Sequence, residues 1–214
     1  MVQLSGAGHE SAWAGFKEGF DAYKRKDYAT AYKELKSAAE QGNANAQFYV
    51  GQMYERGLID YDHSNVNESN IILNRNTLIW YNKSAKQGHV KAQVMLGFMY
   101  YWGSGIPINK KLAVKWFRKA AEQGDPQAQH LLGGMYEAGL GVLKNYKKAA
   151  KWYRKSAEQG RAVAQDDLGR CYREGLGVLK DYKLAVGWFR EGAKQGFPYS
   201  QNNLGLMYRD GKGV

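Results

Sequence analysis

The sequence predicts an all-α protein, a right-handed α-solenoid of helix-turn-helix repeats with a 36-residue period. Three markers recur in one phase, which is the signature of a repeat architecture. The dipeptide Gln-Gly returns at intervals of 46, 36, 36 and 36 residues, and Met-Tyr or Cys-Tyr returns at the same intervals. Tryptophan also keeps the period, at Trp80, Trp116, Trp152 and Trp188. Independent markers in one phase indicate units that stack and bury a shared core.

The period divides the chain into a short tail at 1–9 and a single solenoid domain at 10–214. The first repeat is divergent, because it carries only part of the later pattern. The second repeat contains an inserted segment at 57–76, which we expect to be a mobile polar loop. The repeats fall at about 10–42, 43–88, 89–124, 125–160 and 161–196, followed by a half repeat at 197–214.

Each repeat is predicted to contain two helices, and the fourth repeat shows why. Apolar residues recur at spacings of three and four over 125–138, which is the period of a helix with one apolar face. Asp125 can cap the start of this helix, and Gly139 can end it in a left-handed conformation. After a short loop, Asn145 can cap a second helix at 146–159. The same order of signals returns in the third and fifth repeats.

Glycine recurs inside the first helix of each pair, at Gly51, Gly97, Gly133, Gly169 and Gly205. A glycine in a helix interior costs about 1 kcal/mol relative to alanine. Its use at the same position in every later repeat therefore predicts close packing of helix backbones at these points, and we expect these glycines to have no catalytic role.

The recurring pattern is A-x-x-x-L-G-x-M-Y-x-x-G-x-G-V, followed by K-x-A-x-x-W-[FY]-[RK]-x-[AS]-A-x-Q-G. It resembles the SEL-one-like repeat family, a branch of the tetratricopeptide-like α-solenoids. In the fourth repeat the resemblance is carried by Ala128, Leu132 to Tyr136, Gly139, Lys148 and Trp152 to Gly160. It covers about residues 43–214 and implies a fold that holds proteins together rather than a particular chemistry.

Composition and motifs argue against several other classes of protein. The single cysteine, Cys171, allows no intramolecular disulfide framework and occupies a core position. No stretch approaches the roughly 20 apolar residues of a membrane-spanning helix. No catalytic or phosphate-binding motif occurs, so we expect no enzyme, no cofactor and no metal site. The start of the chain carries no visible signal peptide, which leaves the localisation open: cytoplasmic by default, or periplasmic if the ends are trimmed.

The inserted segment carries three acidic residues and a histidine, at Asp60, Asp62, His63 and Glu68, which raises the question of a metal site. The order of these residues does not follow that of a calcium-binding EF-hand loop. We therefore interpret the segment as a polar loop rather than as a metal site.

The resemblance implies that the first helix of each pair lines a concave groove. In the third repeat this face carries Phe98, Tyr101 and Trp102, and aromatic residues with arginine are typical of interface hot spots. We expect the aromatic residues to anchor a partner and the arginines to bind its acidic groups. Alternatively, the aromatic residues pack beneath the segment at 57–76. The predicted groove residues are Phe48, Val94, Phe98, Tyr101, Trp102, His130, Arg170, Arg173 and Arg209.

A second candidate surface is a basic ridge on the second helices. Its cations follow one helical stripe and contribute most of the formal net charge of +11. Such a stripe is either a solvated convex face or a binding surface, in the first place for an acidic protein partner and after that for nucleic acid or an anionic membrane. The ridge consists of Lys115, Arg118, Lys119, Lys147, Lys151, Arg154 and Lys155.

The sequence thus predicts a non-catalytic protein–protein interaction module, a scaffold or adaptor that binds a partner in its concave groove. We expect that partner to be another protein with an acidic surface or segment, and we do not expect nucleic acid, because no recognised reader motif occurs. The resemblance raises one alternative: a bacterial immunity protein that neutralises a secreted toxic effector such as a lipase. The oligomeric state stays open.

Overall fold

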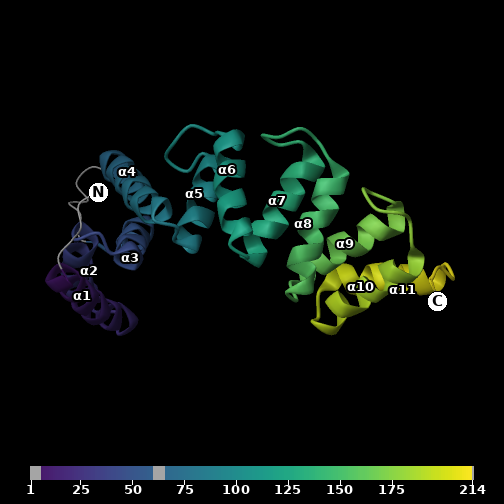
Figure 1. Ribbon diagram of the computed structural model, residues 1–214, viewed down its shortest axis with the longest axis horizontal. Helices are drawn as coiled ribbons and strands as arrows, with labels where there is room; N and C mark the ends of the chain where they lie inside the picture. The colour runs from purple at the N-terminus through teal and green to yellow at the C-terminus, as the bar shows by residue number, and fades with distance from the viewer. Residues whose placement is uncertain (1–5, 60–65, 214) are drawn as a thin grey trace. The chain divides into compact units, whose positions relative to one another are not determined.

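The computed structural model describes the backbone of residues 6–59 and 66–213 and the side chains of residues 11–59 and 74–213. These described residues are all-helical and contain no strand, which confirms the predicted class (Figure 1). They form eleven helices: α1 Gly6–Lys24, α2 Tyr28–Glu40, α3 Ala44–Glu55, α4 Val66–Lys86, α5 Val90–Trp102, α6 Lys110–Glu122, α7 Pro126–Ala138, α8 Tyr146–Glu158, α9 Ala162–Glu174, α10 Tyr182–Lys194 and α11 Pro198–Arg209.

The chain separates into two compact parts, an N-terminal half at Met1–Asn109 and a C-terminal half at Lys110–Val214. In the N-terminal half, α1 pairs with α2 and α3 with α4, and α5 packs on α4. In the C-terminal half, α7 pairs with α8 and α9 with α10, while α6 packs on α7 and α11 on α10. Helices that contact mainly their neighbours along the chain are characteristic of a solenoid of repeats.

The predicted helix signals of the fourth repeat are confirmed. The side chain of Asp125 accepts a hydrogen bond from the backbone N–H of Ala128, 2.7 Å away, at the start of α7. Gly139 ends that helix with a left-handed φ of 73°. Asn145 caps α8 by accepting from the N–H of Lys148 at 2.9 Å. Short polar side chains at the start and glycine just past the end therefore set these boundaries.

Two predicted boundaries differ from the structure. Helix α1 begins at Gly6, so residues 6–9 belong to a helix and not to the expected tail. Helix α4 begins at Val66, so the part of the inserted segment at 66–76 is helical and not a loop. The many Asn and Ser residues there favoured a loop on composition, but intrinsic propensity is a weak signal that a longer helix overrides. The side chains for which the sequence raised the question of a metal site lie outside the described residues: Asp60, Asp62, His63 and Glu68.

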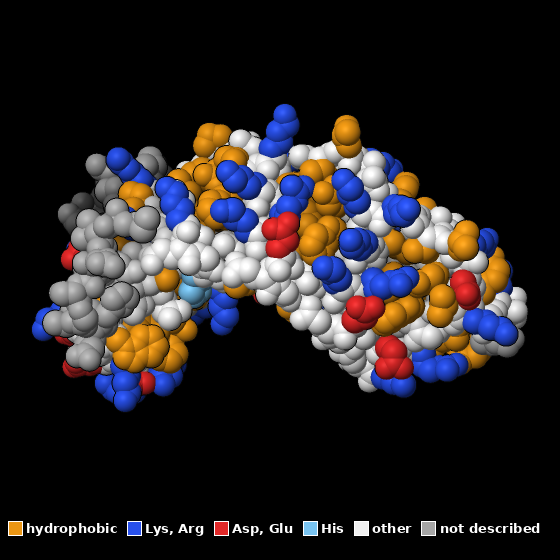
Figure 2. Space-filling model, in the orientation of Figure 1, with side chains coloured by type: hydrophobic (Ala, Val, Ile, Leu, Met, Phe, Trp, Pro, Cys, Tyr) orange, Lys and Arg blue, Asp and Glu red, His pale blue; other side chains and the backbone are white. Residues whose placement is uncertain are grey.

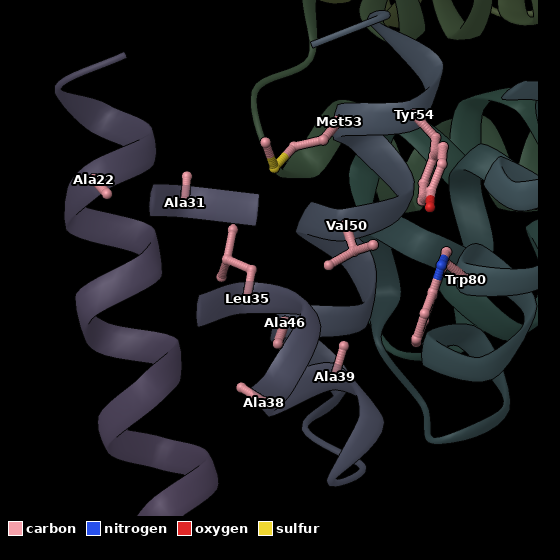
Figure 3. Close-up of a cluster of buried hydrophobic side chains, with 10 residues drawn as sticks. All are labelled: Ala22, Ala31, Leu35, Ala38, Ala39, Ala46, Val50, Met53, Tyr54 and Trp80. Atoms are coloured by element: carbon pink, nitrogen blue, oxygen red, sulfur yellow. The ribbon is translucent and has the colours of Figure 1, made fainter. Parts of the chain in front are cut away.

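The core of the N-terminal half is built from alanine and a few larger apolar side chains. Small residues from α1, α2 and α3 let these helices approach closely, while Leu35, Val50 and Met53 fill the space between them (Figure 3). Trp80 from α4 closes the cluster. The buried members are Ala22, Ala31, Leu35, Ala38, Ala39, Ala46, Val50, Met53, Tyr54 and Trp80.

Three of the glycines inside the first helices face aromatic rings of the paired second helices. A Cβ added at Gly133 would lie 2.6 Å from the Tyr153 ring, and one added at Gly169 would lie 2.6 Å from the Phe189 ring. Gly51 meets Tyr81 in the same way, at 2.7 Å. Each of these three contacts is closer than a real side chain tolerates, so the helices pack closely there, but against a ring and not against a backbone as expected. At Gly205 the expectation is wrong, because among the described residues nothing lies within 4 Å of an added Cβ.

Buried glutamines connect successive helices of the stack. Gln129 Nε2 donates to the carbonyl of Ala121, 3.1 Å away, and Gln159 Nε2 donates to Gln129 Oε1 at 2.8 Å. Gln165 and Gln195 repeat this arrangement one repeat later, the second donating to the first at 2.8 Å. The recurring Gln-Gly marker thus has a structural reason: its exposed glutamine supplies the hydrogen bond that the buried amide of Gln129 or Gln165 requires.

Candidate functional site

A hollow of about 420 Å³ lies on the N-terminal half, formed mainly by α1 and α3. We call it the basic aromatic hollow, because its lining combines aromatic rings with cationic side chains. The turn between α1 and α2 contributes Lys26, which adopts a left-handed backbone with φ 64°. The full lining is Phe20, Tyr23, Lys24, Lys26, Tyr28, Phe48, Tyr49, Gln52, Arg56 and Lys91.

Tyr49 is the centre of the aromatic wall of the hollow. Its ring centroid lies 4.9 Å from that of Phe20, 5.4 Å from that of Tyr23 and 5.3 Å from that of Phe48. The tilted and edge-on geometries of these pairs are the ones that aromatic rings prefer. The rings therefore hold one another in place and present a preformed apolar surface.

Hydrogen bonds fix the polar side of the hollow. The Tyr23 hydroxyl donates to Gln52 Oε1 at 3.0 Å and accepts from Arg56 Nη1 at 3.2 Å. Burial raises the pKa of Tyr23 and of Tyr49 above the usual value for tyrosine. Both hydroxyls thus stay neutral at physiological pH and serve as hydrogen-bonding groups rather than as charges.

The charged side chains that line the hollow are all cations. Lys24 pairs with Asp21 at 2.7 Å, outside the lining. Within the part of the chain that the structure describes, no ion pair is recorded for Lys26, Arg56 or Lys91. An apolar wall beside cationic side chains can hold a ligand that joins an apolar group to a carboxylate or another anion.

The predicted groove residues of the N-terminal half have different environments. Phe48 is 5% exposed, lines the hollow and stacks on the ring of His89 with centroids 4.7 Å apart. Val94 is buried, so it offers little surface to a partner. Trp102 is 67% exposed and its ring meets that of Tyr101 edge-on at 4.8 Å, whereas Phe98 is half-buried. Packing beneath the inserted segment would involve side chains outside the described residues.

His89 leads to a pH-dependent prediction. Its Nδ1 accepts a hydrogen bond from the N–H of Ala92 at 3.1 Å and so caps α5. Burial lowers the pKa of His89 below its ordinary value of 6.5. The unfolded chain therefore binds this proton at higher pH than the folded chain, and the free energy of unfolding should fall as the pH drops below 6.5.

The measurement is urea unfolding at pH 7.5 and pH 5.0 for the wild-type chain and for His89→Asn. Asparagine keeps the capping acceptor and cannot titrate. The wild-type chain should lose more stability on acidification than the variant does. Equal losses in both proteins would assign the acid sensitivity to other groups.

The predicted groove residues of the C-terminal half form an internal polar network. Arg170 lies between Glu137 and Asp167, with nitrogen–oxygen distances of 2.7 Å and 3.1 Å. His130 Nε2 lies 2.8 Å from Asp167 Oδ2, which brings His130 and Arg170 to the same carboxylate. Arg173 donates to Asn203 Oδ1 at 2.8 Å.

This network changes the role of the arginines. Burial alone would raise the pKa of Glu137, but hydrogen bonds from Arg170 and Tyr153 outweigh it and lower that pKa. The charge of Arg170 is therefore compensated inside the chain, and Arg209 pairs with its neighbour Asp210 at 3.0 Å. We expected these arginines to bind acidic groups of a partner. The local charge balance does not support that expectation, because carboxylates of the chain itself already pair with Arg170 and Arg209.

The basic ridge lies on α6 and α8 of the C-terminal half, a part of the molecule where Lys and Arg side chains gather (Figure 2). Part of it serves the fold. Arg118 Nη2 donates to the Tyr136 hydroxyl at 2.9 Å, and Arg154 donates to the Tyr172 hydroxyl. Lys119 and Lys155 lie over the rings of Trp116 and Trp152, each 5.0 Å from the centroid. Lys115, Lys147 and Lys151 are exposed.

The arginine–tyrosine contacts are expected to make a small, measurable contribution to stability. Removing the hydroxyl with Tyr136→Phe deletes the acceptor of Arg118, and a hydrogen bond of this kind contributes about 0.5–1.5 kcal/mol. Chemical denaturation should therefore show a loss in that range with an unchanged circular dichroism spectrum. A loss near zero would show that Arg118 is solvated equally well without its partner.

Cys171 is buried, and burial raises its pKa to about 12, as expected for a core residue and not for a nucleophile. Sequence reasoning missed several residues of the hollow, among them Phe20, Tyr23, Tyr49 and Lys91. The density of aromatic residues in the divergent first repeat is a signal that could have found Phe20 and Tyr23, whereas Tyr49 and Lys91 lie in later repeats and carry no such signal.

Comparison with known families identifies the repeat. The family model described as Sel1 repeat matches at residues 15–43, 44–65, 75–89, 90–125, 126–160, 162–197 and 198–214. None of the curated proteins matches the chain. In the described part of the chain, no helix has the length and apolar character needed to cross a membrane.

Solved structures of Sel1 repeat proteins share the fold. A Sel1 repeat protein from Oxalobacter formigenes is 38% identical with a TM-score of 0.82, covering 93% of this chain and 78% of that chain. A protective antigen of uropathogenic Escherichia coli strains, which displays an SLR fold, is 39% identical with a TM-score of 0.77. That match covers 86% of this chain but 37% of the antigen, so the chain spans little more than a third of it. An immunity protein from Pseudomonas aeruginosa is 19% identical over 94% of this chain and 86% of that chain, and its TM-score of 0.44 carries no argument about function.

Proposed function

The chain belongs to the Sel1 repeat family, and on that premise we propose that it is a non-catalytic scaffold that binds an acidic segment of a partner protein in the basic aromatic hollow. Sel1 repeat proteins are generally protein-interaction modules. The observation that carries the proposal is the lining itself: five aromatic rings and four cations, with no carboxylate among them.

The chemistry of the hollow defines the segment that fits it. An apolar or aromatic side chain would pack on the rings around Tyr49, and flanking carboxylates would meet Lys26, Arg56 and Lys91. Charge-assisted hydrogen bonds to carboxylates are about twice as strong as neutral ones. The neutral Tyr23 hydroxyl adds a hydrogen-bonding group beside them. An extended segment that alternates acidic and apolar residues matches this arrangement.

Helix α5 extends the proposed site toward the aromatic residues predicted from sequence. Lys91 and Trp102 are eleven residues apart in the sequence, which returns to the same face of a helix after about three turns. They are separated by about 16 Å along the axis, a distance that about five residues of an extended peptide span. We therefore assign Trp102 and Tyr101 to a second contact with the same segment, and we leave the buried Val94 out of the surface.

The test is a selection of random 12-residue peptides displayed on phage against the wild-type chain. Arg56→Glu/Lys91→Glu serves as the counter-selection protein, once thermal unfolding has shown that its melting temperature equals that of the wild type. We expect enriched peptides that combine Asp or Glu with aromatic or aliphatic residues. No enrichment, or peptides that bind both proteins equally, would contradict the proposal. The identity of the natural protein that carries the selected motif then shows whether the chain acts as a general adaptor or as an immunity protein.

A further inference from the structure

Two leucines on the C-terminal half project almost completely into solvent. Leu143 is 91% exposed and Leu179 is 92% exposed. They occupy the same position in successive repeats, in the loops that lead into α8 and α10. Left-handed glycines hold these loops, among them Gly141 and Gly177 with φ of 71° each. Single exposed apolar residues need no explanation, but a pair repeated at the tips of two rigid loops indicates a surface that meets something apolar.

Lysines surround both loops. A Cβ added at Gly177 would meet the carbonyl of Tyr146, which places the second loop against the start of α8. There Val178, the neighbour of Leu179, lines a hollow of about 190 Å³ together with Lys147, Lys151 and Arg154. The exposed leucine thus lies close to the lysines of the preceding repeat. In Figure 2, basic side chains alternate with apolar ones over this part of the molecule.

The lysines of this surface are not held in close ion pairs, although Lys144 is among the charges that lower the pKa of Glu137. Within the residues whose side chains are described, no ion pair is recorded for Lys144, Lys147, Lys151 or Lys180. Lys144 and Lys180 lie over the rings of tyrosines at the starts of α8 and α10, 4.8 Å and 4.9 Å from the centroids. A ring contact of this kind positions a cation without neutralising it. We call the surface formed by Leu143, Lys144, Lys147, Lys151, Leu179 and Lys180 the leucine–lysine edge.

We propose that the leucine–lysine edge docks onto an anionic lipid membrane, with the two leucines inserted among the lipids and the lysines at the headgroups. Interfaces with proteins are enriched in Tyr, Trp and Arg and depleted in Lys, whereas the most exposed side chains of this surface are two leucines among several lysines, with Arg154 beside them. Peripheral membrane surfaces combine projecting apolar residues with Lys and Arg that attract anionic lipids. This docking surface is independent of the partner site in the N-terminal half.

The probe is a phosphatidylcholine vesicle containing 30 mol% phosphatidylserine, used in sedimentation assays at about 0.1 M and 0.5 M salt, with pure phosphatidylcholine as the reference. The wild-type chain should bind the anionic vesicles and not the neutral ones. Leu143→Ser/Leu179→Ser should bind about tenfold more weakly, and Lys147→Glu/Lys151→Glu about 100-fold more weakly. Because these side chains are exposed, both variants should melt at the wild-type temperature.

The matched control is Arg56→Glu/Lys91→Glu, which changes the net charge by the same amount in the N-terminal half. It should keep vesicle binding within about threefold while losing the selected peptides, so the two proposals fail separately. If Leu143→Ser/Leu179→Ser binds the anionic vesicles as tightly as the wild-type chain does, the proposal is overturned, because net charge alone would then account for vesicle binding. The proposal would also be overturned if the leucine–lysine edge bound poly-glutamate but no anionic vesicles. The partner of this surface would then be an acidic protein and not a membrane.

Discussion

Replacing Gly133 with alanine is expected to lower the free energy of unfolding by about 1–3 kcal/mol, the usual cost of forcing extra volume into a packed core. The added Cβ would lie 2.6 Å from the ring of Tyr153, and this ring is 2% exposed. A buried ring cannot move aside as the end of a flexible side chain can. Either α7 and α8 separate or the ring leaves its position, and both responses lose core contacts.

Replacing Gly205 with alanine should instead raise the free energy of unfolding. This glycine occupies the equivalent repeat position in α11, but within the described residues nothing lies within 4 Å of an added Cβ. Alanine then gains only its helix preference, up to about 1 kcal/mol. Thermal and urea unfolding of the two variants checks the pair. Destabilisation by both changes would show that helix α11 itself requires glycine, and the packing explanation would then be wrong.

Reversing two charges of the basic aromatic hollow should weaken peptide binding at least about 30-fold. In Arg56→Glu/Lys91→Glu, two attractive contacts with a carboxylate become repulsive, while the aromatic wall around Tyr49 stays intact. Fluorescence anisotropy with a selected acidic peptide measures the dissociation constant. The affinity of the wild-type chain should also fall with added salt, because the contacts at the rim of the hollow are screened.

A control variant in the same half separates local from global charge. Lys33→Glu/Lys86→Glu makes an equal change of net charge at two exposed lysines that do not line the hollow. It should leave the dissociation constant within about threefold of the wild-type value. If both charge-reversal variants lose the peptide to the same extent, long-range attraction and not the hollow accounts for binding.

Much of the fold follows from the spacing of a few residue types. The repeat period, the capping by Asp125 and Asn145 and the close approach at Gly133 are all local patterns, so they can be inferred without the structure. The start of α4 could not be inferred in this way, because a polar helix and a polar loop have similar composition. Hydrophobic periodicity is the signal that distinguishes them, and it is weak where one face is rich in Asn.

The candidate site was less predictable than the fold. Phe48 was assigned to the groove from its repeat position, and the structure places it in the wall of the hollow. Half of the lining, Phe20 to Tyr28, comes from the divergent first repeat, where the repeat pattern gives little guidance to orientation. Arg170 illustrates the opposite error, since its carboxylate partners come from two different helices. Sequence spacing shows which face a residue occupies but not which charges neutralise it.

The most direct test of the central claim is photo-cross-linking from within the hollow. A benzophenone side chain introduced in place of Lys24, which lines the hollow and is exposed, should cross-link a selected acidic peptide in the N-terminal half. The same group in place of the exposed Tyr199 in α11 should give no cross-link above background. Cross-linking from position 199 but not from position 24 would contradict the account, because it would place the partner on the C-terminal half.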